Sequence, residues 1–136
     1  LNIGDARLMD QDALDKFDCV LLDAPCSGLG IIRRKPDIRW QRKADDLNQL
    51  SEIQLEMLEN ASKYVKIGGV IVYSTCTITK RENEEVTQLF LSRHPEFEMD
   101  RLTGISEKYI RDGQLKILPH LHGMDGFYAC RMKRLK

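Results

Sequence analysis

The sequence has 136 residues, enough for one domain with its own hydrophobic core. Hydrophobic residues make up 42% and charged residues 31%, a balance typical of a globular protein rather than a disordered or membrane-spanning one. The 21 basic and 21 acidic side chains cancel, so any nucleic-acid site must come from a local cluster of charge. No secretory signal, long apolar span or C-x-x-C pair occurs, and His120 and His122 have no third ligand nearby. We therefore expect a cytoplasmic protein with no membrane anchor and no metal site.

The first predicted elements are a strand and a helix. Residues 17–22 form a continuous apolar run, typical of a strand buried on both faces, and the proline and glycine of residues 23–28 then indicate a loop. Apolar residues recur at three- and four-residue steps between 47 and 65, which predicts a helix with one apolar face. Asp45 and Asp46 suit the start of this helix, and Gly68-Gly69 is expected to end it.

A second strand and helix follow. The β-branched run at residues 70–73 predicts another buried strand, which leads directly into Cys76. Thr79 and Glu82 have the spacing of a capping box, so the next helix is expected from about residue 81 to residue 94. Its inward side chains are predicted to be Val86, Leu89 and Phe90.

The last third of the chain predicts a closing strand pair. Residues 97–102 indicate a weak strand, residues 103–114 are polar and loop-like, and residues 115–118 and 127–132 indicate two final strands. Alternation of strand and helix is typical of a doubly wound α/β sheet. The predicted fold is therefore half of a Rossmann-like α/β sheet that closes with an antiparallel strand pair.

The chain has four cysteines, and two of them follow predicted strands. Cys26 and Cys76 lie in loops after the two predicted parallel strands, and the carboxyl ends of such strands share one edge of the sheet. We therefore expect these two thiols, together with Asp23, to lie close together. Cys19 and Cys130 lie in apolar runs and are expected to be buried as small hydrophobic residues.

Two cysteines and a carboxylate at one sheet edge suit a particular reaction. C5 of cytosine is a poor nucleophile, but addition of a thiolate to C6 turns the ring into an enamine whose C5 attacks an electrophilic methyl group. This route requires a cysteine nucleophile, a group that handles protons and a hydrogen-bonding group at the pyrimidine edge. Cys76, Cys26 and Asp23 supply these residue types.

The same loops carry a family resemblance. Asp23-Ala24-Pro25-Cys26-Ser27-Gly28 and Ser74-Thr75-Cys76 resemble the fourth and sixth motifs of the Nop/Sun family of RNA cytosine-5 methyltransferases, and in particular its bacterial small-subunit ribosomal RNA branch (Sun or Fmu). Further matching segments are Gly4-Asp5-Ala6-Arg7, residues 33–40, Glu82-Asn83-Glu84 and Asp125-Gly126-Phe127-Tyr128-Ala129. These segments follow the family's order along nearly the whole chain.

The resemblance implies roles for individual residues and a cofactor. Cys76 would be the nucleophile on C6, and Cys26 would assist proton removal or release of the methylated RNA. Asp23 would hydrogen-bond the cofactor or the flipped base, and Asp5 would contact the adenine end of S-adenosylmethionine. The implied substrate is RNA, specifically the small-subunit ribosomal RNA.

Two other functions remain open on the sequence. A DNA cytosine-5 methyltransferase would use the Pro-Cys cysteine, Cys26, as its nucleophile and usually lacks the second cysteine. A non-catalytic RNA-binding module could keep the fold but would have no need of a nucleophile. The presence of both cysteines with Asp23 favours the RNA methyltransferase.

Positive charge is concentrated after the first cysteine loop. Arg33, Arg34, Lys35 and Arg39 are predicted to bind RNA phosphates, although a basic loop exposed to solvent would have the same composition. Trp40 either stacks on RNA or packs in the core, and the core is the preferred interpretation.

The chain is expected to be one portion of a longer enzyme. It begins at Leu1, and residues 1–136 are interpreted as the C-terminal portion of a methyltransferase catalytic domain that lacks the glycine-rich cofactor loop and an N-terminal RNA-binding domain. We therefore expect this chain alone to bind S-adenosylmethionine weakly and to be inactive. Loss of neighbouring strands would leave the strand at residues 17–23 with an open edge, so self-association through that edge is predicted.

Overall fold

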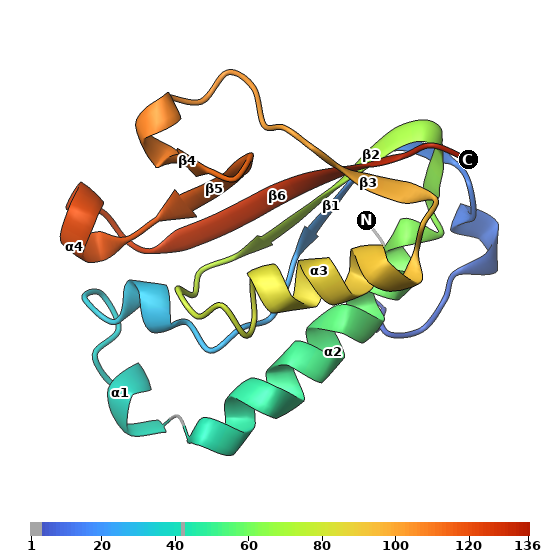
Figure 1. Ribbon diagram of the computed structural model, residues 1–136. Coiled ribbons are helices and arrows are strands. Elements are labelled where there is room, and N and C mark those ends of the chain that lie inside the picture. Colours follow the sequence, from blue (N-terminus) through green and yellow to red (C-terminus); the bar gives the residue numbers. More distant parts are fainter. Residues whose placement is uncertain (1–3, 42) are drawn as a thin grey trace.

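A computed structural model describes residues 4–41 and 43–136, which form one mixed sheet with helices on one face (Figure 1). The strands are β1 (Phe17–Asp23), β2 (Val65–Thr75), β3 (Phe97–Asp100), β4 (Ile110–Arg111), β5 (Gln114–Ile117) and β6 (Phe127–Arg134). The hydrogen-bonded order is β1-β2-β6-β5-β4, and β3 pairs with β6 beyond the end of β5.

The sheet begins parallel and ends antiparallel. β1 and β2 run parallel, with Val20 opposite Ile71 and Asp23 opposite Ser74. β6 then runs antiparallel to β2, β3 and β5, and β4 antiparallel to β5. The predicted α/β sheet with a closing antiparallel pair is confirmed. Its parallel start places the loops after β1 and β2 at the same edge.

Two helices supply one side of the hydrophobic core. Figure 1 shows α2 (Ala44–Ser62) and α3 (Glu84–Arg93) against the same face of the sheet. Their apolar side chains pack against β2 and β6, as the three- and four-residue spacing predicts. The most deeply buried core residues are Leu58, Val65, Ile71, Tyr73, Phe90, Cys130 and Met132. The other helical segments are short: α1 (Ile38–Gln41), α4 (Pro119–His122) and three 3-10 turns, Gln11–Ala13, Leu29–Ile31 and Glu107–Tyr109.

The first strand is more exposed than its sequence predicts. Val20 and Leu22 face the helices, but Phe17 is 48% exposed and Leu21 is 68% exposed. Cys19 is exposed too, so its predicted burial is wrong, whereas Cys130 is buried as expected. The reason is that β1 pairs only with β2 among the described residues and the helices cover only one of its faces. An apolar run therefore does not guarantee two covered faces.

The glycine pair does not end the helix before it. α2 stops at Ser62, and β2 begins at Val65, before Gly68-Gly69. The glycines belong to a bulge where the pairing with β1 shifts between Phe17 and Cys19. Gly68 has a φ of +80°, and a Cβ on Gly69 would lie 2.9 Å from the carbonyl oxygen of Asp18. Close backbone approach, rather than helix termination, explains this pair.

Residues 103–114 contain more structure than the loop that was expected. β4 and β5 form a hairpin across Asp112-Gly113, both of which have positive φ, at 53° and 78°. This is the backbone geometry that an Asp-Gly hairpin turn adopts.

In α3, Val86 and Phe90 point inward as predicted, but Leu89 is 42% exposed. None of the helices in the described part of the chain is long and apolar enough to cross a membrane.

Candidate active site

The two cysteine loops meet at the carboxyl ends of the parallel strands. β1 ends at Asp23 and its loop carries Cys26, while β2 ends at Thr75 and Cys76 follows at once. The sulfur atoms of Cys26 and Cys76 lie 3.3 Å apart. Their juxtaposition, which the strand order predicts, is therefore present in the fold. Both thiols are partly exposed, so a ligand can reach them.

Burial and the neighbouring thiol act on Cys26. Burial, followed by the hydrogen bond with Cys76, raises the pKa of Cys26 to about 12. Cys26 therefore keeps its proton at neutral pH. In a pair of sulfurs at this separation, a protonated Cys26 can donate its S–H to Cys76.

Asp23 lies at the same edge and is exposed. One of its carboxylate oxygens accepts a hydrogen bond from the Ser74 hydroxyl at 2.8 Å, and Ser74 is its register partner on β2. This bond fixes the carboxylate at the sheet end while leaving the side chain open to solvent. The geometry therefore groups Asp23, Cys26 and Cys76, the three residues that the sequence suggested for catalysis.

A buried carboxylate joins the two cysteine loops from beneath. Glu82 is fully buried, and its two carboxylate oxygens are contacted by groups from both loops and from α2. From the Cys26 loop, the Ser27 backbone N–H donates at 2.7 Å and the Ser27 hydroxyl at 2.6 Å. From the Cys76 loop, the hydroxyls of Thr77 and Thr79 donate at 3.1 Å and 2.8 Å. The Gln54 amide of α2 adds a bond of 3.1 Å.

These contacts show that the capping-box interpretation is wrong. α3 begins at Glu84, and Glu82 lies before it in a turn. The Glu82 backbone N–H does approach the Thr79 hydroxyl at 3.4 Å, but the carboxylate turns into the interior instead of capping a helix end. Sequence spacing alone cannot distinguish a capping box from this buried carboxylate network, because both place a threonine and a glutamate three positions apart.

Two glycines bring a third segment against the same loops. The Gly30 N–H donates to the Cys76 carbonyl at 3.0 Å, and the Gly126 N–H donates to the Gly30 carbonyl at 2.7 Å. A Cβ on Gly30 would lie 2.4 Å from the Gly126 carbonyl oxygen, and one on Gly126 would lie 2.4 Å from a methyl group of Ile78. Only glycine permits this backbone approach, which explains why a glycine precedes β6 in the motif at residues 125–129.

Comparison with known proteins decides the family. A family model described as 16S rRNA methyltransferase RsmB/F matches residues 1–133. The chain belongs to the RsmB/F family of 16S rRNA methyltransferases. It is 49% identical over 125 residues to the probable ribosomal RNA small subunit methyltransferase B of Bacillus subtilis, covering 88% of this chain and 28% of that protein.

Two solved structures share the fold of this chain. The crystal structure of PH0851 has a TM-score of 0.88 and 37% identity, over 96% of this chain and 30% of that one. NSun6 from Pyrococcus horikoshii, crystallised with SFG, has a TM-score of 0.81 and 27% identity, over 98% of this chain and 34% of that one. The chain therefore spans about a third or less of the length of these relatives. The family is one of S-adenosylmethionine-dependent methyltransferases.

Asp5 is not beside the cysteines of this RsmB/F chain. The Arg7 side chain binds its carboxylate, and these hydrogen bonds lower the pKa of Asp5 to about 2. The Arg7 carbonyl accepts a bond from Asn60, near the end of α2, and α2 ends where β2 begins. Asp5 thus lies toward the end of the sheet opposite Cys26 and Cys76. Its role at the cofactor stays a prediction.

The four basic residues of the segment at residues 33–39 have two kinds of surroundings. Arg33 donates to the Gly123 carbonyl at 3.2 Å, and Arg34 forms an ion pair with Asp125 at 2.5 Å. These two arginines hold the loop against the segment before β6. Lys35 and Arg39 are exposed and form no ion pair within residues 4–41 and 43–136. Lys35 and Arg39 are therefore the members of this set that remain open to a partner.

The prediction that Trp40 packs in the core is wrong. It is 85% exposed at the end of the short α1, so it does not belong to the core. A four-residue helix with no buried side chain cannot hold an indole against the sheet. The described residues contain no cluster of three or more His, Cys, Asp and Glu side chains that could hold a metal ion.

We predict that Glu82→Gln will destabilise the fold. Its amide group would face donors such as the Ser27 N–H and the Gln54 amide, leaving buried polar groups without an acceptor. The expected loss in free energy of unfolding is about 2–4 kcal/mol, measured by urea denaturation. Glu85→Gln is the matched control, because Glu85 is exposed and its one ion pair among the described residues is with Arg81 at 3.4 Å. The control should lose about 0.5 kcal/mol or less, and equal losses would contradict the role assigned to Glu82.

Proposed function

We propose that this chain supplies the base-attacking part of an enzyme that methylates C5 of cytosine in RNA. The observation that carries the proposal is the 3.3 Å approach of Cys26 and Cys76 beside Asp23, in a member of the RsmB/F family. Relatives described as small subunit ribosomal RNA methyltransferases point to 16S ribosomal RNA as the substrate. The chain covers less than a third of those relatives, so the activity is proposed for a longer protein that contains residues 1–136.

Cys76 is the proposed nucleophile. Its thiolate forms a bond to C6 of the cytosine, and the electrons displaced from the C5–C6 double bond make C5 nucleophilic. S-adenosylmethionine, when bound, supplies the electrophilic methyl group. After C5 is methylated, C5 loses its proton to a base, the C5–C6 double bond re-forms, and the C6–sulfur bond breaks to return the Cys76 thiolate.

Cys26 is proposed to act at the last of these steps. Burial raises the pKa of Cys26, which favours its neutral thiol form, so it donates a proton or hydrogen bond more readily than it accepts one. From 3.3 Å it can stabilise the sulfur of Cys76 as the bond to C6 breaks. This favours release of the RNA over proton removal as the role of Cys26.

Asp23 fits the role of a hydrogen-bond acceptor for the cofactor or the flipped base. It is exposed, and the Ser74 hydroxyl binds only one of its oxygens. Of the two carboxylates predicted to bind S-adenosylmethionine, Asp23 alone lies beside the cysteine loops, whereas Asp5 is bound by Arg7. Lys35 and Arg39 remain predicted contacts for RNA phosphates.

This chain by itself is predicted to bind S-adenosylmethionine weakly and to be inactive. A single carboxylate beside the cysteines provides few contacts, so we expect a Kd of about 1 mM or weaker in a calorimetric titration. The full-length enzyme is the comparison and should bind much more tightly. Micromolar binding by residues 1–136 alone, lost on Asp5→Asn, would overturn this expectation and restore Asp5 to the site.

Separate replacement of the two cysteines tests the mechanism in the full-length enzyme. Cys76→Ser should form no covalent complex with RNA that contains 5-fluorocytidine, since no thiolate is available at C6. Cys26→Ser should accumulate a covalent complex even with ordinary cytidine RNA, because release is slowed. Denaturing gel electrophoresis measures both. The DNA methyltransferase alternative predicts the reverse pattern on DNA, and a non-catalytic RNA-binding module predicts no complex from any variant.

Self-association through β1 is a further prediction for the isolated chain. β1 pairs on one side only among the described residues, and Phe17 and Leu21 are exposed. Light scattering should show a mass that rises with concentration, and Leu21→Lys should suppress the rise. Leu121→Lys is the control, since Leu121 is 53% exposed in α4, away from this edge. A constant monomer mass at high concentration would refute the prediction.

A further inference from the structure

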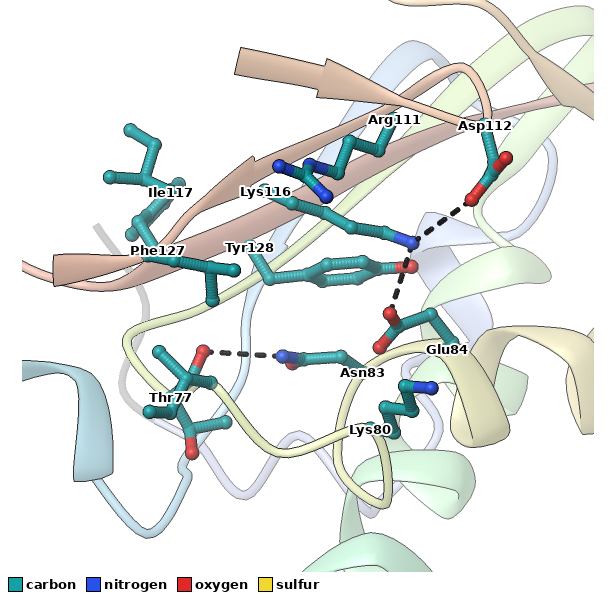
Figure 2. Close-up of a pocket in the computed structure, with 12 residues that line it drawn as sticks. Thr77, Lys80, Asn83, Glu84, Arg111, Asp112, Lys116, Ile117, Phe127 and Tyr128 are labelled. Atoms are coloured by element: carbon teal, nitrogen blue, oxygen red, sulfur yellow. Dashed lines mark hydrogen bonds and ion pairs between the residues drawn. The ribbon is translucent and has the colours of Figure 1, made fainter. Parts of the chain in front are cut away.

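A cavity of about 310 Å³ lies against the loop that carries Cys76. Figure 2 shows its lining, which comes from that loop, the start of α3, the β4-β5 hairpin and the start of β6. Thr77, directly after Cys76, is one of the lining residues. Asn83 lines it too, donating to the Thr77 carbonyl at 3.2 Å and accepting from the Thr75 hydroxyl at 2.6 Å. The cavity wall is thus continuous with the cysteine loop.

Two basic side chains that line the cavity form no ion pair with a described acidic residue. Lys116 is largely covered and forms ion pairs with Glu84 at 3.0 Å and Asp112 at 3.4 Å, so one lysine engages both acids of the lining. Lys80 and Arg111 are exposed and form no ion pair with any described residue. Figure 2 draws Arg111 on the side of the hairpin and Lys80 on the loop before α3. The cavity therefore has an unbalanced positive charge at two points.

The rest of the lining is apolar and partly open. Ile78 is 40% exposed, and Ile117, Leu118 and Phe127 are half-buried around it. Cations beside an apolar wall suit a ligand that carries both an anion and an apolar ring, which describes a nucleotide. The volume also excludes a whole helix or a folded partner, but it accommodates one nucleotide unit.

We propose that this cavity binds the nucleotide next to the target cytidine. Lys80 and Arg111 contact its phosphate, while Ile78 and Phe127 contact its ribose or base. The inference rests on the proposed function, since it assumes that the cytidine attacked by Cys76 belongs to RNA. It assigns a substrate contact to a surface separate from the basic segment at residues 33–39.

The test is steady-state methylation of a single-stranded oligoribonucleotide by the full-length enzyme. Lys80→Ala with Arg111→Ala should raise KM for RNA about tenfold or more while kcat changes little, because phosphate contacts bind substrate without taking part in the reaction. The slope of log KM against log salt should fall by about 0.7, the contribution of one single-strand phosphate contact. Lys80→Arg with Arg111→Lys keeps both charges and should restore most of the affinity.

A matched control and an altered RNA separate the outcomes. Lys16→Ala with Lys63→Ala removes two exposed charges at the opposite end of the sheet and should leave KM and the salt slope unchanged. An uncharged methylphosphonate at one linkage beside the target cytidine should weaken wild-type binding but not binding by the double alanine variant. An active wild type whose double variant matches the control would overturn the cavity assignment alone. A wild type that neither methylates RNA nor forms an adduct would overturn the proposed function and this inference with it.

Discussion

The carboxylate of Glu82 is the constraint on which the cysteine site depends. It is fully buried, and groups from the Cys26 loop, the Cys76 loop and α2 all donate hydrogen bonds to it. A buried carboxylate is costly unless its oxygens are satisfied, so the loops must come together for the group to be tolerated at all. The same requirement fixes where the two thiols lie, because Cys26 directly precedes Ser27 and Cys76 directly precedes Thr77.

Backbone hydrogen bonds hold a third segment against the two cysteine loops that Glu82 connects. Gly30 binds the Cys76 carbonyl, and Gly126 binds Gly30, so the segment before β6 is drawn against both loops. Arg34 and Asp125 reinforce this approach from the surface. The parallel pairing of β1 with β2 provides the shared edge, and the buried polar network then sets the separation of the sulfurs on it. The sheet brings the two loops together, and the buried carboxylate holds them so that the sulfur atoms lie 3.3 Å apart, as the proposed mechanism requires.

Much of the fold, and the grouping of Asp23, Cys26 and Cys76 at one sheet edge, could be predicted from the sequence, because periodicity and strand order are local signals. Asp23 and Cys26 follow an apolar run, Cys76 follows a β-branched run, and the carboxyl ends of neighbouring parallel strands share an edge. The burial of single residues could not be predicted in the same way. Cys19 and Leu21 look like core residues, but one face of β1 lacks a cover, and Trp40 lies on a helix too short to bury it.

The errors at glycines and at Glu82 have a common physical cause. Gly68-Gly69 and Thr79 with Glu82 match familiar local patterns, yet each serves a contact with a residue distant in the chain. The spacing of residues along the sequence cannot distinguish a helix end from a β-bulge, or a helix cap from a buried carboxylate that binds distant loops. The Asp112-Gly113 hairpin, by contrast, has a local signal, since an Asp-Gly pair favours the positive φ that both residues adopt.

Mapping the covalent adduct would show which of the two thiols attacks C6 of the cytosine. The full-length wild-type enzyme would be trapped with RNA containing 5-fluorocytidine, digested with trypsin and ribonuclease, and analysed by mass spectrometry. Trypsin places Cys76 in the peptide of residues 67–80 and Cys26, with Cys19, in that of residues 17–33. If Cys76 is the nucleophile, the nucleotide will be found on the first peptide, at Cys76. A nucleotide on Cys26 would contradict the proposed mechanism, because the thiol assigned to release of the RNA would then be the nucleophile.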